Sequence, residues 1–229
     1  MVMPLYDDDA RQRVSQPYVT WALVTINVVA FFVLCLMPEV KQLEIIHSFG
    51  FTAAHIADFS HHARDALLTP LSSMFLHISW EHLFFNMLFL MIFGDNVEDA
   101  LGHVRYLVFY LLCGYAGSFA DFLANIHSVR QEVGASGAVS GVVVAYLMIR
   151  PCAKIEVLIS FFPVALSAYW VVGFFAATQA WNLIAHTENG VAYWAHLGGM
   201  VMGALLLPLL RHPDVVLFEC MSEPSRASP

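Results

Sequence analysis

The chain has 229 residues, of which 59% are apolar and only 12% are charged. Roughly a quarter of the residues are charged in a soluble globular domain, so this composition excludes an ordinary soluble protein and indicates a membrane protein. The formal net charge of −8 decides little here, because acidic residues contribute weakly to membrane topology.

The first half of the chain contains three predicted membrane helices. Residues 1–16 are a polar leader, which does not fit a cleavable signal peptide. A bilayer core of about 30 Å requires about 20 apolar helical residues, so the uncharged segment that follows can span it. A long loop and two further apolar segments come next, the first of them with Ser79 as its expected N-cap. The predicted helices are 18–37, 80–97 and 104–124, and the loop is 38–79.

The second half contains three more predicted helices and a tail. The fourth helix, 136–149, has only 14 residues and would be about 21 Å long, too short to cross the hydrocarbon layer. If it is a membrane helix, it begins within the membrane, after a loop that is buried in protein or lines a wet cavity. The fifth and sixth helices are predicted at 157–185 and 191–210, and the tail, 211–229, is expected to be disordered. The expected fold is an all-α polytopic bundle of six helices, with one domain at 17–210.

Basic residues predict the orientation, because cytoplasmic segments are enriched in Lys and Arg. With the N-terminus inside, seven of the ten basic residues lie in cytoplasmic segments and three lie outside. We therefore expect both termini in the cytoplasm. The seven are Arg11, Arg13, Arg105, Arg150, Lys154, Arg211 and Arg226, and the three are Lys41, Arg64 and Arg130.

The four cysteines show no Cys-x-x-Cys motif and no zinc-ligand spacing. Cys35 and Cys113 lie in different predicted spans. Cys152 and Cys220 lie on the predicted cytoplasmic side, where thiols stay reduced. We expect all four to be unpaired residues that fill space.

Four polar residues fall inside predicted spans, where such residues are costly and are functional candidates by default. His82 and Asn86 share one face of the second helix, His196 lies near the start of the sixth, and Ser136 opens the fourth. These helices all begin on the predicted outer side, so the four residues share a depth in the outer half of the bilayer.

Small residues beside Ser136 and His196 predict which helix faces meet. Faces of glycine and alanine let backbones approach closely in lipid, which can bring the serine hydroxyl within reach of the imidazole. A serine is a weak nucleophile until a base takes its proton. The small residues are Gly199 and Gly203 on the sixth helix and Gly137, Gly141 and Ala145 on the fourth.

Each feature also has a plainer explanation. A Gly-Ala-Ser-Gly run more often packs helices than catalyses, and an intramembrane histidine or asparagine can be a structural hydrogen-bond group. A channel, a transporter or an inactive protease-like protein is therefore one alternative. A metal enzyme using His77, His82 and His196 is another, although the chain lacks His-Glu-x-x-His and the spans offer no intramembrane carboxylate ligand.

Four motifs resemble, in order and spacing, the rhomboid family of intramembrane serine proteases in its compact six-helix bacterial form. The resemblance covers about residues 17–210. The motifs are His77-x4-His82-x3-Asn86, then Phe93-Gly94-Asp95-Asn96-Val97-Glu98, then Gly134-Ala135-Ser136-Gly137, and finally Ala195-His196-Leu197-Gly198-Gly199 with Gly203.

The resemblance implies a Ser136–His196 dyad that cleaves transmembrane segments of other proteins through an acyl-enzyme. It implies a multi-pass protein of the bacterial plasma membrane whose active site opens to the outer side, and no cofactor, metal or nucleic acid. The supporting residues would be His82 and Asn86 in the oxyanion hole, Gly134 in the loop that enters the membrane, and His77 at the loop–helix junction.

The sequence departs from the family pattern at three places. The first loop has no Trp between Pro38 and Ser79, Ser140 stands where some members have an aromatic residue, and Val144 stands where glycine is common. Spans four to six contain no acid, so we expect packing, rather than a carboxylate, to hold His196. The resemblance gives Gly94, Glu98 and Gly102 folding roles. We expect the first-loop histidines, His47, His55, His61 and His62, to be solvated or interfacial.

Overall fold

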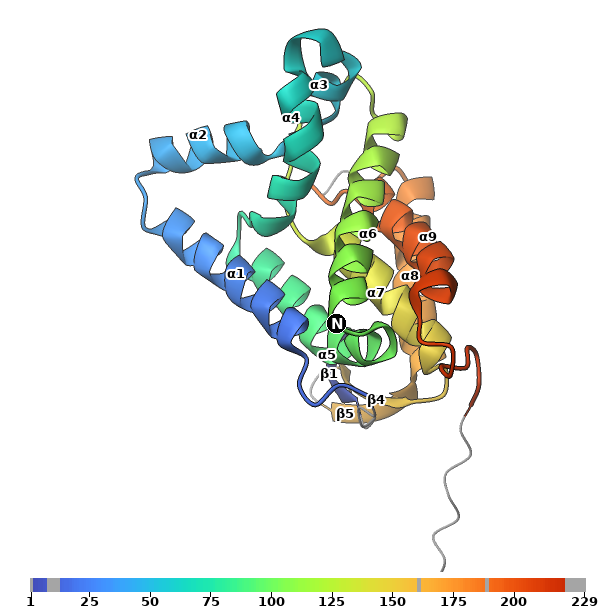
Figure 1. The fold of residues 1–229 in the computed structure, drawn as a ribbon. Coiled ribbons are helices and arrows are strands. Elements are labelled where there is room, and N and C mark those ends of the chain that lie inside the picture. Colours follow the sequence, from blue (N-terminus) through green and yellow to red (C-terminus); the bar gives the residue numbers. More distant parts are fainter. Residues whose placement is uncertain (1, 8–12, 160–161, 188–189, 221–229) are drawn as a thin grey trace, which may run out of the picture.

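The computed structural model describes residues 2–7, 13–159, 162–187 and 190–220. The described chain is mostly helical but also contains two small β-sheets, so the all-α prediction is corrected (Figure 1). The elements are β1 (Val2–Asp7), α1 (Tyr18–Cys35), α2 (Glu39–Phe49), β2 (Phe51–Thr52), α3 (Ala53–Ala57), α4 (Phe59–Ser72), the 3-10 helix η1 (Ser73–Phe75), α5 (Trp80–Leu101), α6 (His103–Ala124), β3 (Gln131–Glu132), α7 (Ser136–Ile149), β4 (Lys154–Ile159), β5 (Phe162–Ser167), α8 (Ala168–Ile184) and α9 (Tyr193–Leu210).

Five of the six predicted helices lie close to their predicted bounds, as α1, α5, α6, α7 and α9. Among the described helices, α1, α6 and α9 are long and apolar enough to cross a membrane. A fourth span results if α4 with η1 and α5, which meet at an angle of 84°, are counted as one bent pair. These helices make the chain a multi-pass membrane protein.

The predicted fifth helix, 157–185, is wrong in its first third. Residues 154–167 form the hairpin β4–β5, with Val157 opposite Val164, and only α8 is helical. In β4, buried Ile155 and Val157 alternate with exposed Lys154 and Glu156, which is the period of a half-buried strand. A search for uncharged runs does not detect this alternation, and the helix was therefore predicted too long.

The leader is more than a polar segment, because β1 pairs antiparallel with β4 and makes the outer strand of a three-stranded sheet. Arg13 then fixes the chain before α1. Its backbone N–H donates to Asp99 at 2.6 Å and its guanidinium pairs with Asp214 at 2.7 Å. Arg11, one of the basic residues used for the orientation, lies outside the described residues.

The tail is also ordered over its described part, contrary to the prediction. The Phe218 N–H donates to the Met148 carbonyl at 2.7 Å, and Cys220 forms a disulfide with Cys152, with Cα atoms 5.3 Å apart. The prediction of four unpaired cysteines is therefore wrong for this pair, because a sequence separation of 68 residues gives no sign of the proximity. Residues 221–229, including Arg226, lie outside the described part.

Helix α7 is at the centre of the bundle, against α5, α6, α8 and α9 (Figure 1). Eleven of its 14 residues are buried. A short helix that is apolar all round is stable when other helices cover it, and this position explains why α7 need not reach both membrane surfaces.

The residues at the α5–α6 turn have folding roles, as the resemblance implies. The fully buried Glu98 carboxylate accepts hydrogen bonds from the backbone N–H groups of Val19 and Thr20 at the start of α1, at 2.9 and 2.8 Å. It thereby satisfies N–H groups that have no partner within α1. Gly102 makes the turn into α6 with φ +77°, a conformation that favours glycine.

Backbone hydrogen bonds join the first loop to the segment that precedes α7. Strands β2 and β3 pair with Phe51 opposite Glu132, and the Gly134 N–H donates to the Ser73 carbonyl at 2.9 Å. At the start of α5, the Ser79 side chain accepts from the His82 N–H at 3.1 Å, which confirms the predicted N-cap. These contacts position both sides of the candidate site.

Candidate active site

Ser136 is the first residue of α7 and follows a sharply turned backbone. Gly134 has φ +122°, and a Cβ atom there would come within 2.5 Å of the His82 ring. Glycine is therefore required at this position for two reasons: the backbone has a positive φ, and the imidazole ring leaves no room for a Cβ atom. The loop delivers Ser136 to the N-terminal end of a buried helix, beside His82.

The start of α7 suits an anion. The first backbone N–H groups of a helix have no intrahelical partner, and the aligned peptide dipoles place a partial positive charge there. An oxygen that gains negative charge beside Ser136 would therefore be stabilised by this helix end.

Helices α7 and α9 approach each other so closely that only glycine fits between them. A Cβ on Gly199 would overlap the Gly137 carbonyl, and one on Gly203 would lie 2.5 Å from the Gly141 oxygen. The predicted meeting of the two small-residue faces is confirmed. It brings the face of α9 that carries His196 to the face of α7 that begins with Ser136.

A cavity of about 600 Å³ joins the polar residues expected at this depth. It lies between α5, the β3 segment, the start of α7, and the facing parts of α8 and α9. Its polar lining includes Ser136, His196, His82, Asn86, Ser140 and Glu132.

His196 is held by a residue that the sequence analysis missed. Its Nδ1 atom lies 2.8 Å from Oε1 of Gln179 on α8. The Gln179 amide nitrogen donates to the Phe175 carbonyl and to the Thr178 hydroxyl, each at 3.3 Å, which leaves Oε1 to face the imidazole. The expectation that packing alone holds His196 is therefore wrong. The available signal was the presence of uncharged polar residues, Thr178, Gln179 and Asn182, in a mostly apolar helix, which a count of acidic residues does not detect.

His82 and His77 pack together on the other side of the cavity. Their ring centroids are 4.9 Å apart and the rings meet edge to face. His77 is fully buried, and within the described part of the chain its ring nitrogens have no hydrogen-bond partner. His77 therefore lies behind His82 and supports its ring, rather than lining the cavity.

Asn86 lines the cavity but also makes a hydrogen bond within its own helix. Its Nδ2 atom donates to the His82 carbonyl at 2.9 Å, one turn back along α5. An amide nitrogen carries two N–H groups, so this bond fixes the side chain and leaves a second N–H as a donor.

Glu132 is an acidic residue that lines the cavity near Ser136, and its side chain is only 12% exposed. Its protonation therefore depends on its surroundings in the protein. Burial and a hydrogen bond to Asp121 on α6 raise the pKa of Glu132 well above the usual carboxyl range. The Arg130 guanidinium is 4.0 Å away and opposes this rise. Burial and the neighbouring Asp121 therefore disfavour the charged form of Glu132 in this wall of the cavity.

The departures from the family pattern also have a structural account. Ser140 is buried, and its hydroxyl has no hydrogen-bond partner among the described residues. Because serine has no ring, it cannot pack against the imidazole as an aromatic residue at this position would. Tyr193 instead lies edge-on to His196 with ring centroids 6.3 Å apart. Gln179 and Tyr193 thus occupy the supporting role that Ser140 leaves open.

The fold and the cavity together define a multi-pass membrane protein with a serine, three histidines and an asparagine gathered at one end of a buried helix. A family model for the rhomboid domain matches residues 64–213, which is more than half of the chain. The chain belongs to the rhomboid family.

Named relatives agree with this assignment. The chain is 38% identical over 144 residues to Rhomboid protein 1, mitochondrial, of Saccharomyces cerevisiae, covering 60% of this chain and 40% of that protein. It is 33% identical to Rhomboid protease GluP of Bacillus subtilis, covering 59% and 25%. It is 28% identical to Rhomboid protease AarA of Providencia stuartii, covering 58% and 52%. The chain thus spans between a quarter and about half of the length of these relatives.

Proposed function

We propose that this chain is an intramembrane serine endopeptidase that cleaves other membrane proteins within or next to their transmembrane segments. The observation that carries the proposal is the cavity in which Ser136, at the start of α7, shares a wall with His196, whose Nδ1 is held by Gln179. Two relatives named as rhomboid proteases support the same reaction class.

The hydrogen bond to Gln179 decides which nitrogen of His196 can act as the base. A glutamine oxygen only accepts, so the Nδ1 atom carries the proton and the Nε2 lone pair is free. In the proposed reaction, Nε2 takes the Ser136 proton while Oγ attacks the scissile carbonyl carbon. The imidazolium then gives this proton to the leaving amine, and water hydrolyses the acyl-enzyme with His196 again as the base.

The oxyanion formed in this attack would be stabilised by the backbone N–H groups at the start of α7 and by side-chain donors from α5. His82 and the second N–H of Asn86 are the proposed donors, and Gly134 gives the His82 ring the room that it occupies. Donors of this kind contribute about 10²–10³ each to the rate in soluble serine proteases.

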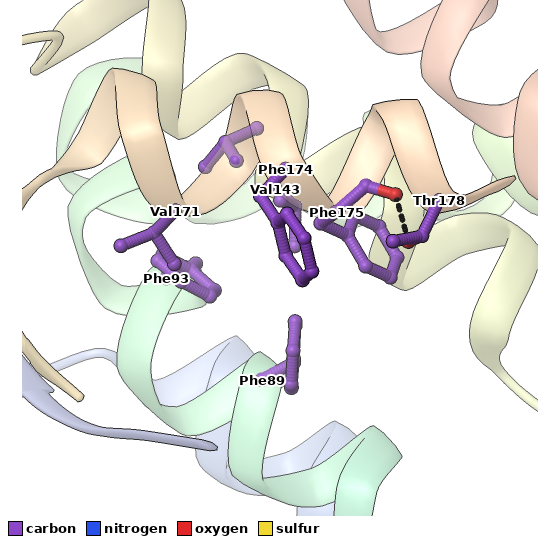
Figure 2. Close-up of a pocket in the computed structure, with 8 residues that line it drawn as sticks. Phe89, Phe93, Val143, Val171, Phe174, Phe175 and Thr178 are labelled. Atoms are coloured by element: carbon purple, nitrogen blue, oxygen red, sulfur yellow. Dashed lines mark hydrogen bonds between the residues drawn. The ribbon is translucent and has the colours of Figure 1, made fainter. Parts of the chain in front are cut away.

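A second, apolar cavity indicates where a substrate helix would approach. It has a volume of about 170 Å³ and is lined mainly by aromatic and β-branched side chains of α5, α7 and α8. Figure 2 shows Phe89 and Phe93 of α5 facing Phe174 and Phe175 of α8 across it. Phe89 and Phe175 also line the active-site cavity, so an apolar segment between α5 and α8 would lead to Ser136.

We further propose that all six predicted helices are membrane helices. Helix α7 is short and covered by its neighbours, whereas α8 leaves most of its large apolar side chains exposed, as a helix that faces lipid does. The distribution of basic residues supports cytoplasmic termini and an active site that opens to the outer face, which in a bacterium is the outer face of the plasma membrane.

The proposal is tested by incubating the purified chain in liposomes with a generic single-span membrane protein and identifying the cut bond. The expected result is one or a few cuts within or next to the span, absent in Ser136→Ala. Cleavage that persists in Ser136→Ala would contradict the proposed mechanism.

A further inference from the structure

The first loop contains a cluster of side chains that the active site does not use. His55 of α3 and His62 and Asp65 of α4 each offer a ligand atom, and these atoms lie within 4.8 Å of one another. The two imidazole rings are stacked with centroids 4.3 Å apart, and Nδ1 of His62 is 3.4 Å from Oδ2 of Asp65. Helices α3 and α4 lie at the upper end of the molecule in Figure 1, beside the end of α6.

The local backbone explains why three separated residues converge. Helix α4 is kinked at His62, where φ is −126° and ψ is 26°. The kink turns the His62 side chain to His55 in the short helix before it, and Asp65, three residues later, lies on the same face of α4. The sequence predicted no metal site, because the spacing His55-x6-His62-x2-Asp65 follows no familiar ligand motif and depends on this kink.

Two imidazole nitrogens and one carboxylate oxygen are a donor set that Zn²⁺ and similar divalent ions prefer. Bonds of about 2.1 Å in tetrahedral geometry place ligand atoms roughly 3.4 Å apart. The pair His62–Asp65 already has this separation, at 3.4 Å. The other ligand atoms are at most 4.8 Å apart, and this distance must shorten for an ion to bind. Rotation of a partly exposed imidazole side chain can shorten it.

The surroundings of the cluster also suit a metal ion. All three residues are half-buried, so an ion can enter from solvent and a water molecule can fill the fourth position.

We propose that His55, His62 and Asp65 form a binding site for a divalent transition-metal ion of the Zn²⁺ class, separate from the serine active site. The ion would fix α3 to α4. Because α4 leads into Ser73, whose carbonyl holds the Gly134 N–H, the site would also stabilise the loop in front of the nucleophile. It would act as a structural clamp and take no part in the cleavage chemistry.

The test is calorimetric titration of Zn²⁺ into the purified, chelator-stripped full chain without a polyhistidine tag. We expect one ion per chain, with affinity about tenfold or more weaker in His55→Ala, His62→Ala and Asp65→Asn, and with tetrahedral absorption bands when Co²⁺ is used instead. Two matched controls should bind normally. His61→Ala removes an exposed neighbouring imidazole that pairs with Asp58, and His82→Ala removes an imidazole of the active site.

Thermal unfolding gives an independent measurement if a variant folds poorly. Zn²⁺ should raise the melting temperature of the unaltered chain and of His61→Ala, because an ion that binds only the folded state stabilises it. At the same Zn²⁺ concentration it should raise that of Asp65→Asn by clearly less. Three outcomes would each overturn the proposal: no stoichiometric binding, binding of unchanged affinity in His62→Ala, or binding that is lost in His82→Ala.

Discussion

The hydrogen bond between Gln179 and His196 makes the sharpest prediction. Replacing Gln179 by alanine removes the acceptor that holds the proton on Nδ1 and thereby leaves Nε2 free as the base. The bond is strongest when the imidazole becomes charged in the transition state, and hydrogen bonds to charged groups contribute about 1.5–3 kcal/mol. We therefore expect Gln179→Ala to lower kcat about 10- to 100-fold, with little change in KM.

The assay is turnover of a membrane substrate per active site, with the sites titrated by a covalent probe and the melting temperature measured on the same preparation. Gln179→Glu keeps an acceptor oxygen and should recover much of the activity. Asn182→Ala is the matched control, because this amide lies on the same helix and bonds only to the Thr178 carbonyl among the described residues. A normal kcat per site in Gln179→Ala, accompanied by a lower melting temperature, would refute the positioning role and leave a structural one.

Three further predictions concern the oxyanion hole, a buried carboxyl and the topology. Asn86→Ala should lower kcat about 10- to 10³-fold at unchanged KM, measured per titrated site, whereas a purely structural Asn86 would change only the melting temperature. The folded chain holds a proton on Glu132 that the unfolded chain releases near the ordinary pKa of 4.5, so stability should fall as the pH rises above that value. Glu132→Gln keeps the hydrogen bond to Asp121 and should flatten this fall in a series of melting curves, and an unchanged pH profile would contradict the raised pKa. Single cysteines at Arg64 and Lys154 in a cysteine-free background should react with an impermeant reagent from outside at Arg64 only. Reaction at Lys154 would reverse the orientation and would agree with an oxidising compartment for the disulfide at that end.

The parts of the fold that the sequence predicts are those that depend on local patterns. Helix α7 begins at Ser136 and ends at Ile149 as expected, because a glycine turn precedes it and its apolar run stops at Arg150. The hairpin β4–β5 was missed because six-residue strands and an apolar helix look alike when only charges are counted. In β4, the charged residues Lys154 and Glu156 alternate with the apolar residues Ile155 and Val157, and this alternation was the sequence signal of a strand.

The parts that the sequence does not predict are those that depend on the three-dimensional packing. Motifs and shared depth select Ser136, His196, His82 and Asn86, and the structure places all four around one cavity. Gln179 is 17 residues from His196 and belongs to no motif, so only the packing of α8 against α9 reveals it. The Cys152–Cys220 disulfide likewise depends on how the tail folds back on the bundle.

Covalent labelling by a fluorophosphonate probe tests the central claim most directly, because the probe reacts with a serine only where a base activates it. We expect labelling of the unaltered chain on Ser136, identified by peptide mass, and its loss in Ser136→Ala and in His196→Ala. Ser140→Ala removes a second serine of the same cavity, one turn further along α7, and should still be labelled. Labelling that persists in Ser136→Ala, or that survives unchanged in His196→Ala, would contradict the proposed pairing of nucleophile and base.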